Sequence, residues 1–306
     1  MQEWDIVIVG AGPGGLCAGL YGARANRKTV CIEKMIPGGE IVNTEWVEDY
    51  PGFEMIGGTE LAQKFENHAR KFGLEIITDN VTEISSDGKY KIVRADGDEY
   101  RAKAVIVASG GHPKKLGVPG EDKLAGRGVS YCAICDGAFF KNEIIAVSGG
   151  GDAAVEEGMF LTKYGKKVYI IHRRDQLRAQ KIIQNRAFKN DKIEIVWNSV
   201  IEKINGKAKV ESVTVKNVKT GEVRDLAVGA VFPFIGFVPN SAIFRDKVNI
   251  DENGYIITNQ NMETNIKGIW AIGDVRRQLC KQITNATGDG TTAAVAADKY
   301  IETWDD

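Results

Sequence analysis

Short apolar runs and a helix-like segment alternate in the N-terminal part of the chain. The runs DIVIVG (residues 5–10) and TVCIEK (29–34) have the length and apolar character of buried strands. Residues 14–26 between them have the pattern of a helix, so the three segments predict a βαβ unit. A later run, AVIVASG (104–110), predicts another parallel strand of the same sheet.

The same order of elements occurs a second time further along the chain. The run EIIAVSGG (143–150) predicts a strand, residues 152–165 predict a helix, and KVYIIHRR (167–174) predicts the next strand. A terminal apolar strand is expected at AVFPFIG (230–236). Two copies of one βαβ plan favour an α/β fold with two Rossmann-like domains.

Two proline-containing stretches, residues 112–120 and 236–244, are typical of linkers between domains. Beyond them, GIWAIGD (268–274) resembles a strand followed by a ligand-facing loop, and residues 288–304 predict a final helix. If this C-terminal part returns to the first domain, the second domain is an insertion joined by both linkers. Such a double linker permits a rigid rotation about a hinge.

Length and charge narrow the function classes. A chain of 306 residues exceeds the size at which one core usually stops growing, which agrees with two domains. The 40 basic and 41 acidic residues nearly cancel, so charge gives no support for a nucleic-acid or membrane-surface partner. No export signal or membrane-length apolar run is recognisable, and five cysteines do not suit a secreted disulfide framework. We therefore expect a soluble cytoplasmic protein.

A glycine fingerprint follows the first predicted strand. Gly10, Gly12 and Gly15 fit the pattern G-x-G-x-x-G at the point where a strand passes into a helix, and Pro13 and Gly14 lie within it. The first glycine makes a tight turn, the second admits a pyrophosphate, and the third allows the helix to pack on the strand. An ordinary glycine turn is the alternative, and the order of strand, fingerprint and helix argues against it.

An acidic residue supports the same interpretation. Glu33 ends the second strand 18 positions after Gly15, close to the spacing of about 20 residues at which a carboxylate accepts ribose hydroxyls. This combination predicts that the first site binds FAD.

The second fingerprint differs where the first has its acid. Gly149 and Gly151 begin a G-x-G-x-x-A variant, and the strand after it ends in HRRDQLR (172–178). Guanidinium groups bind a 2′-phosphate bidentately, whereas a carboxylate would repel it. The second site is therefore expected to bind NADPH. On a helix Arg174 and Arg178 would share a face; a solvated charged helix end is the less favoured alternative.

These sites define the predicted domains. The FAD-binding domain comprises residues 1–114 and 244–306, and residues 115–243 form the inserted NADPH-binding domain. The inserted domain also contains a pair of cysteines.

The motif YCAICDG places two residues between Cys132 and Cys135, with Asp136 directly after the second cysteine. A zinc site needs four ligands, and the remaining cysteines and histidines show no ligand spacing. A structural disulfide gains most by closing a long loop, and this pair encloses two residues. Redox chemistry remains the best explanation, with Asp136 as a neighbouring proton donor.

Taken together, the motifs resemble those of the low-molecular-weight thioredoxin reductases of bacterial type. The resemblance covers essentially the whole chain and rests on segments that include GAGPGGLCAGLYGARAN, VIVASG, YCAICDG, GGGDAAVEE, HRRDQLRA and AIGDVR. The resemblance implies roles for individual residues. In this family the second cysteine, here Cys135, faces the flavin, the first, Cys132, attacks the protein disulfide, and the aspartate, Asp136, acts as the acid.

The implied cofactor contacts are distributed over both fingerprints and the C-terminal loop. Those to FAD are Gly10, Gly12, Pro13, Gly14, Gly15, Glu33, Gly39, Glu40, Asp274, Lys281, Gln282 and Ile283. Those to NADPH are Gly149, Gly151, Asp152, Ala153, His172, Arg173, Arg174 and Arg178.

Several positions depart from the family pattern. Glu40 replaces the usual Gln, Asp49 the usual Asn, Lys281 the usual Arg, Ile134 the usual Thr and Ser109 the usual Thr. Three of these, Glu40, Asp49 and Lys281, are expected near the flavin, so they are expected to affect its potential more than the fold.

The resemblance implies a thioredoxin-disulfide reductase that passes electrons from NADPH through FAD and the Cys132–Cys135 disulfide to thioredoxin. Because the nicotinamide site and the cysteines share a domain, they reach the flavin only in turn, so domain rotation is expected between the half-reactions. A homodimer is also implied. Two alternatives remain open: delivery of the electrons to ferredoxin, to oxygen or to a thioredoxin-like protein of a peroxidase system, and a non-catalytic flavin redox sensor.

Overall fold

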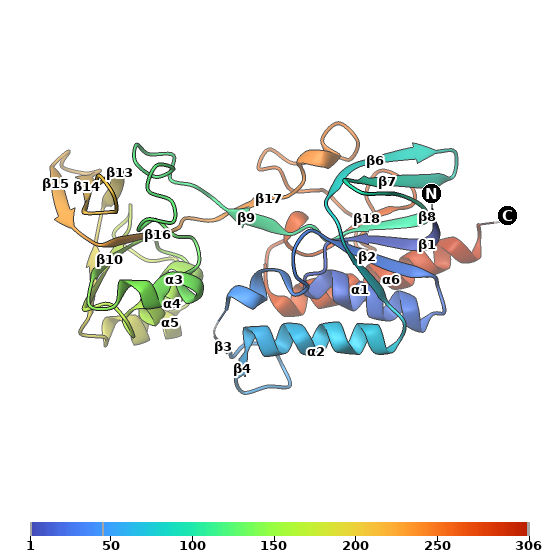
Figure 1. Cartoon of the computed structure of the whole chain (residues 1–306), viewed down its shortest axis with the longest axis horizontal. Coiled ribbons are helices and arrows are strands. Elements are labelled where there is room, and N and C mark those ends of the chain that lie inside the picture. Colours follow the sequence, from blue (N-terminus) through green and yellow to red (C-terminus); the bar gives the residue numbers. More distant parts are fainter. Residues whose placement is uncertain (1, 45, 305–306) are drawn as a thin grey trace. The chain divides into compact units, whose positions relative to one another are not determined.

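The structure is a computed structural model that describes residues 2–44 and 46–304, and only the backbone of Cys135. The chain divides into two compact units (Figure 1). Unit 1 comprises Met1–His112 and Val238–Asp306, and unit 2 comprises Pro113–Phe237. Each unit has a sheet with a parallel part that is flanked by helices, as the repeated βαβ pattern predicts.

Unit 1 is built on a mixed sheet in the order β5-β2-β1-β8-β7-β6, with β18 added beside β8. β5, β2, β1, β8 and β18 are parallel, and β7 and β6 continue antiparallel. The C-terminal half of β8 pairs with β18, and its N-terminal half with β7. The strands are β1 (Gln2–Val9), β2 (Thr29–Glu33), β5 (Glu75–Thr78), β6 (Val81–Asp87), β7 (Tyr90–Ala95), β8 (Glu99–Val107) and β18 (Ile269–Ala271).

The central strand β1 is buried on both faces of this sheet. Ile6 and Ile8 of β1 belong to one apolar cluster, and Val7 and Val9 belong to another. Since successive side chains of a strand point to opposite faces, β1 carries core on both sides, which explains its unbroken apolar run. Helices α1 (Pro13–Arg24), α2 (Gly58–Lys71) and α6 (Ile283–Glu302) cover one face (Figure 1).

Unit 2 contains a smaller parallel sheet in the order β12-β11-β10-β16 and a separate antiparallel sheet in the order β13-β14-β15. The parallel sheet consists of β10 (Ile144–Gly149), β11 (Lys167–Ile171), β12 (Ile193–Val196) and β16 (Ala230–Phe234). Its helices are α3 (Ala133–Asp136), α4 (Asp152–Leu161) and α5 (Lys181–Phe188). The antiparallel strands are β13 (Ser199–Asn205), β14 (Ser212–Asn217) and β15 (Val223–Ala227).

The two connections between the units form a two-stranded ribbon of β9 (Gly111–Pro113) and β17 (Phe237–Pro239). These strands lie within or beside the predicted linkers, and the first linker continues beyond β9. The predicted domain boundaries, at 114/115 and 243/244, refer to the cofactor-binding domains and stay predictions. The two compact units divide the chain at 112/113 and 237/238.

Short elements complete both units. They are strands β3 (Trp46–Val47) and β4 (Ile56–Gly57) and the 3₁₀ turns η1 (Gly39–Asn43), η2 (Gly137–Phe140), η3 (Ala242–Phe244) and η4 (Gly273–Val275). Within residues 2–44 and 46–304, no helix has the length and apolar character needed to cross a membrane.

The last helix begins earlier than predicted. The sequence predicts it from residue 288, whereas α6 begins at Ile283 and contains Gly288 and Gly290. Glycines inside a helix are usually unfavourable, so Gly290 needs a structural reason. A Cβ at Gly290 would lie 2.4 Å from the carbonyl oxygen of Gly14 in α1, so close packing of α1 on α6 requires a glycine there.

Candidate functional site

The turn between β1 and α1 has tight first and third glycines and an open second glycine. A Cβ on Gly10 would lie 2.4 Å from the carbonyl oxygen of Ala108, and one on Gly15 would lie 1.9 Å from that of Gly10. At Gly12 the nearest atom to such a Cβ is the Cα of Gly39, 4.0 Å away. No side chain caps the N-terminus of α1. The turn therefore has room and free N–H groups for a pyrophosphate, which fits FAD.

Pro13 and Gly14, which are also predicted to contact FAD, contribute to the start and the packing of α1. Pro13 is the first residue of α1, where its missing N–H is not needed. A Cβ on Gly14 would lie 3.0 Å from the carbonyl oxygen of Ala286, so this glycine faces α6.

Glu33 lies at the end of β2 and is joined to the glycine turn. Its Oε2 accepts a hydrogen bond from the N–H of Ala11 at 2.8 Å, and its Oε1 accepts one from Met35 at 3.0 Å. A carboxylate has about four lone-pair sites, so Glu33 retains acceptor capacity for ribose hydroxyls. These bonds orient the carboxylate at the edge of the predicted FAD site.

Gly39 and Glu40 lie beside the same turn. The N–H of Gly38 donates to the carbonyl of Ala11 at 2.8 Å, which holds this segment against the glycine fingerprint. Desolvation raises the pKa of Glu40, and the charge of Asp274 raises it further. The structure thus places two of the predicted flavin residues, far apart in sequence, close enough for their charges to interact.

The loop that carries Asp274 is held on both sides of Gly273. The N–H of Gly273 donates to Asp289 Oδ2 at 3.0 Å, and its carbonyl accepts from Gln278 Nε2 at 3.0 Å. Asp289 is buried, and burial raises the pKa of its carboxyl group. Arg276 Nε lies 3.6 Å from the same carboxylate. The sequence does not predict the bond from Gly273 to Asp289, because Asp289 lies in α6, 16 residues further along the chain.

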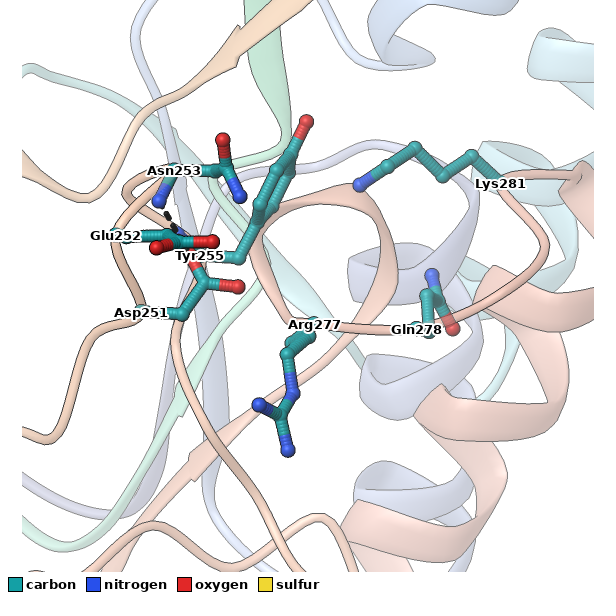
Figure 2. A pocket seen from close by; sticks show the side chains of 7 residues that line it. All are labelled: Asp251, Glu252, Asn253, Tyr255, Arg277, Gln278 and Lys281. Carbon is teal, nitrogen blue, oxygen red and sulfur yellow. Dashed lines mark hydrogen bonds between the residues drawn. The ribbon is translucent and has the colours of Figure 1, made fainter.

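Lys281 belongs to the same loop and borders a cavity of about 480 Å³ (Figure 2). Its Nζ donates to the carbonyl of Asp274 at 3.0 Å and lies 3.7 Å from the centroid of the Tyr255 ring. Gln282 and Ile283 follow at the start of α6, whose N-terminus has no side-chain cap. The cavity is lined by Asp251, Glu252, Asn253, Tyr255, Arg277, Gln278 and Lys281.

The second fingerprint repeats the steric pattern of the first. A Cβ on Gly149 would lie 2.3 Å from the carbonyl oxygen of Phe234 and 2.5 Å from the Cβ of Ala154. A Cβ on Gly151 would meet nothing within 4 Å, and no side chain caps α4. The N-terminus of α4 is therefore accessible to a second pyrophosphate.

This pattern makes opposite predictions for two alanine substitutions. Gly151→Ala is expected to leave the thermal midpoint unchanged and to raise the KM for NADPH about tenfold or more, because the added methyl group occupies the space left for the phosphates. Gly149→Ala is expected to destabilise unit 2 by about 2 kcal/mol or more through its clash with β16. Thermal unfolding and steady-state kinetics measure both effects. Equal loss of stability in both variants would contradict an open second position.

Three other predicted NADPH residues surround the turn. The ring of His172 is buried and would lie 2.3 Å from a Cβ on Gly150, so the ring packs directly against the backbone of the turn. Burial lowers the pKa of His172, which favours the neutral ring. Asp152 accepts from the N–H of Gln180 at 2.7 Å, and Ala153 is exposed in the first turn of α4.

The arginines lie in a loop, and the expectation that Arg174 and Arg178 share a helix face is wrong. Residues 172–180 are not helical, and α5 begins only at Lys181. The N–H of Arg178 donates to the carbonyl of Gly150 at 2.7 Å, which joins this loop to the glycine turn. The loop forms one side of a cavity of about 450 Å³ lined by Arg173, Arg174, Asp175, Gln176, Leu177, Arg178, Asn198 and Lys219. Its cationic lining suits a phosphate group.

The cysteine motif forms a single helical turn in unit 2. Cys132 is disulfide-bonded, and its N–H donates to Ser130 Oγ at 3.1 Å. The N–H of Asp136 donates to the carbonyl of Cys132 at 3.2 Å, and the Asp136 side chain is half-buried. The side chain of Cys135 lies outside the described part of the structure, so its predicted pairing and role remain predictions.

Three cysteines outside the motif, Cys17, Cys31 and Cys280, are free thiols. Cys31 is buried, Cys17 is half-buried, and Cys280 is exposed. Burial raises the pKa of the Cys17 and Cys31 thiols, which keeps them protonated at neutral pH. No cluster of three or more metal-ligating side chains occurs among the residues that the structure describes.

The two phenylalanines after the cysteine turn have different environments. Phe139 is 79% exposed. Phe140 packs edge-on against Phe232 with ring centroids 5.8 Å apart. Phe139 is therefore the more accessible of the two side chains.

Comparisons with known proteins agree with this arrangement. The model of the pyridine nucleotide-disulphide oxidoreductase family matches residues 4–290. Thioredoxin reductase of Bacillus subtilis is 50% identical over 300 residues, which cover 98% of this chain and 95% of that protein. The crystal structure of Lactococcus lactis thioredoxin reductase superposes with a TM-score of 0.96 at 48% identity, covering 98% of this chain and 99% of that one. That of the T. acidophilum enzyme gives 0.94 at 33% identity, covering 98% and 99%.

Proposed function

Since the chain belongs to the pyridine nucleotide-disulphide oxidoreductase family, and within it to the thioredoxin reductases, we propose that it reduces the disulfide of thioredoxin with electrons from NADPH. The electrons pass by way of FAD and a Cys132–Cys135 redox disulfide. One observation carries the proposal: two unlike dinucleotide turns occur in one chain, and the cysteine turn lies in the same unit as the arginine loop.

Each part of the site has a distinct task in this reaction. FAD, when bound, would supply the two-electron chemistry that links NADPH to the disulfide. The turn at Gly12 and the carboxylate of Glu33 hold the flavin dinucleotide, and the turn at Gly151 and the arginine loop hold NADPH. Cys132, as a thiolate, attacks the thioredoxin disulfide and forms a mixed disulfide, which Cys135 resolves. Asp136 supplies the proton for the leaving thiolate.

The proposed sequence of steps requires unit 2 to move between two states. The cysteine turn and the NADPH site both belong to unit 2, whereas the flavin site belongs to unit 1. Each must meet the flavin in turn, so we include in the proposal a rotation about the connections β9 and β17. A homodimer and a cytoplasmic location also belong to the proposal and rest on the family resemblance.

The proposed function is tested with the purified holoenzyme, NADPH or NADH, and a panel of thioredoxins. Nicotinamide oxidation that depends on thioredoxin is expected, with NADPH preferred over NADH by about 100-fold in kcat/KM. Ferredoxin and oxygen serve as alternative acceptors. Rapid NADPH oxidation with either of these, and none with any thioredoxin, would contradict the proposal.

A further inference from the structure

The arginine cavity of unit 2 has a second wall from a distant part of the chain. This wall is the turn between β14 and β15, which carries Lys219. The N–H of Val218 donates to the carbonyl of Asn198 at 2.7 Å, and the N–H of Asn198 donates to the carbonyl of Arg174 at 3.2 Å. This chain of hydrogen bonds fixes the turn to the arginine loop.

The backbone around Lys219 is itself well ordered by local hydrogen bonds. Asn217 Oδ1 accepts from the N–H groups of Lys219 at 2.9 Å and Thr220 at 3.0 Å. The N–H of Gly221 donates to the carbonyl of Asn217 at 2.8 Å. The base of the lysine side chain is therefore held at a defined place beside the cavity.

Positive charge predominates among the residues that line the cavity. Among its lining residues Arg173, Arg174, Arg178 and Lys219 are cationic, and Asp175 is the one carboxylate. Lys219 Nζ lies 2.7 Å from Asp175 Oδ2, and this pairing lowers the pKa of Asp175. In the described part of the chain, no acceptor is bonded to the three guanidinium groups. The lysine thus pairs with the acid and leaves the arginines available.

We propose that Lys219 is a specificity-determining residue, which favours a 2′-phosphorylated dinucleotide by neutralising Asp175 within the cavity. The inference rests on the proposed function, because it presumes that the cavity receives the 2′-phosphate of NADPH. An unpaired carboxylate beside a phosphate dianion repels it, whereas an unphosphorylated dinucleotide places no such charge there. Lys219 consequently affects phosphorylated ligands selectively.

The probes are 2′,5′-ADP and ADP, titrated calorimetrically into the holoenzyme at constant ionic strength. Lys219→Gln is expected to weaken binding of 2′,5′-ADP by about fivefold and to leave ADP binding unchanged. The double variant Lys219→Gln/Asp175→Asn is expected to bind 2′,5′-ADP with an affinity within about twofold of wild type. Lys216→Gln is the matched control, since Lys216 lies on β14, pairs with Glu202 and does not line the cavity.

Two results would overturn the inference. One is wild-type affinity for 2′,5′-ADP in Lys219→Gln, and the other is a double variant as weak as the single one. Equal binding of 2′,5′-ADP and ADP by the wild-type protein would instead overturn the assignment of NADPH to this cavity. Thermal unfolding of each variant shows that it is folded. Because the wild-type comparison tests the assignment of NADPH and the variants test the role of Lys219, failure of the inference is distinguishable from failure of the proposed function.

Discussion

Replacing either Cys132 or Cys135 by serine is expected to lower thioredoxin reduction by at least about 1,000-fold. Serine cannot form a disulfide, so no dithiol is available to donate two electrons to the protein substrate. Reduction of the flavin by NADPH is expected to stay within about twofold of wild type, because the glycine turns and the arginine loop are untouched. Stopped-flow absorbance follows the flavin, and a coupled assay follows thioredoxin.

Cys280→Ser is the matched control for both variants, because Cys280 is an exposed free thiol. It is expected to retain full activity. If Cys132→Ser or Cys135→Ser delivers electrons to thioredoxin at the wild-type rate, the disulfide has no part in the reaction.

The double variant Arg173→Ala/Arg174→Ala is expected to lower kcat/KM for NADPH by about 100-fold. Both side chains are exposed and line the cavity where a phosphate would lie. Hydrogen bonds between charged groups contribute about 1.5–3 kcal/mol each, so the loss of two such partners accounts for an effect of this size. Because NADH lacks the 2′-phosphate, its kcat/KM is expected to change by about twofold or less. Steady-state kinetics with both nucleotides measure the change in preference.

Arg224→Ala is the control for a general loss of positive charge from unit 2, since Arg224 lies exposed on β15 outside the cavity. It is expected to leave both nucleotides unaffected. Unaltered use of NADPH by the double variant would refute the assignment of the arginine loop to the 2′-phosphate.

The parts of the fold that could be predicted are those whose signal is local. β1 and β10 are buried on both faces of parallel sheets, so each appears in the sequence as an unbroken apolar run before a glycine turn. The sequence places the start of α6 at residue 288, whereas the helix begins at Ile283. The glycine at position 290 is explained only by its contact with α1, which lies far away in sequence. The antiparallel sheet of β13, β14 and β15 was not predicted from the sequence.

The candidate site shows the same division. The glycines, Glu33 and the arginines occur at short, interpretable spacings. The structure adds the long-range partners: Asp289 on the loop of Asp274, and Lys219 on Asp175. Nothing in the local sequence of either residue indicates these pairings, because they depend on how distant elements pack. The loop geometry at Arg178 also follows from a long-range bond, to the carbonyl of Gly150.

The most direct test of the proposed function is a single-turnover transfer without oxygen. The holoenzyme is reduced with NADPH, freed of excess nucleotide and mixed with oxidised thioredoxin, and thiols are alkylated at successive times and located by mass spectrometry. The expected result is that free thiols at Cys132 and Cys135 disappear at the rate at which two thiols appear on thioredoxin. Appearance of thioredoxin thiols while Cys132 and Cys135 remain unalkylated throughout would contradict electron transfer through this pair.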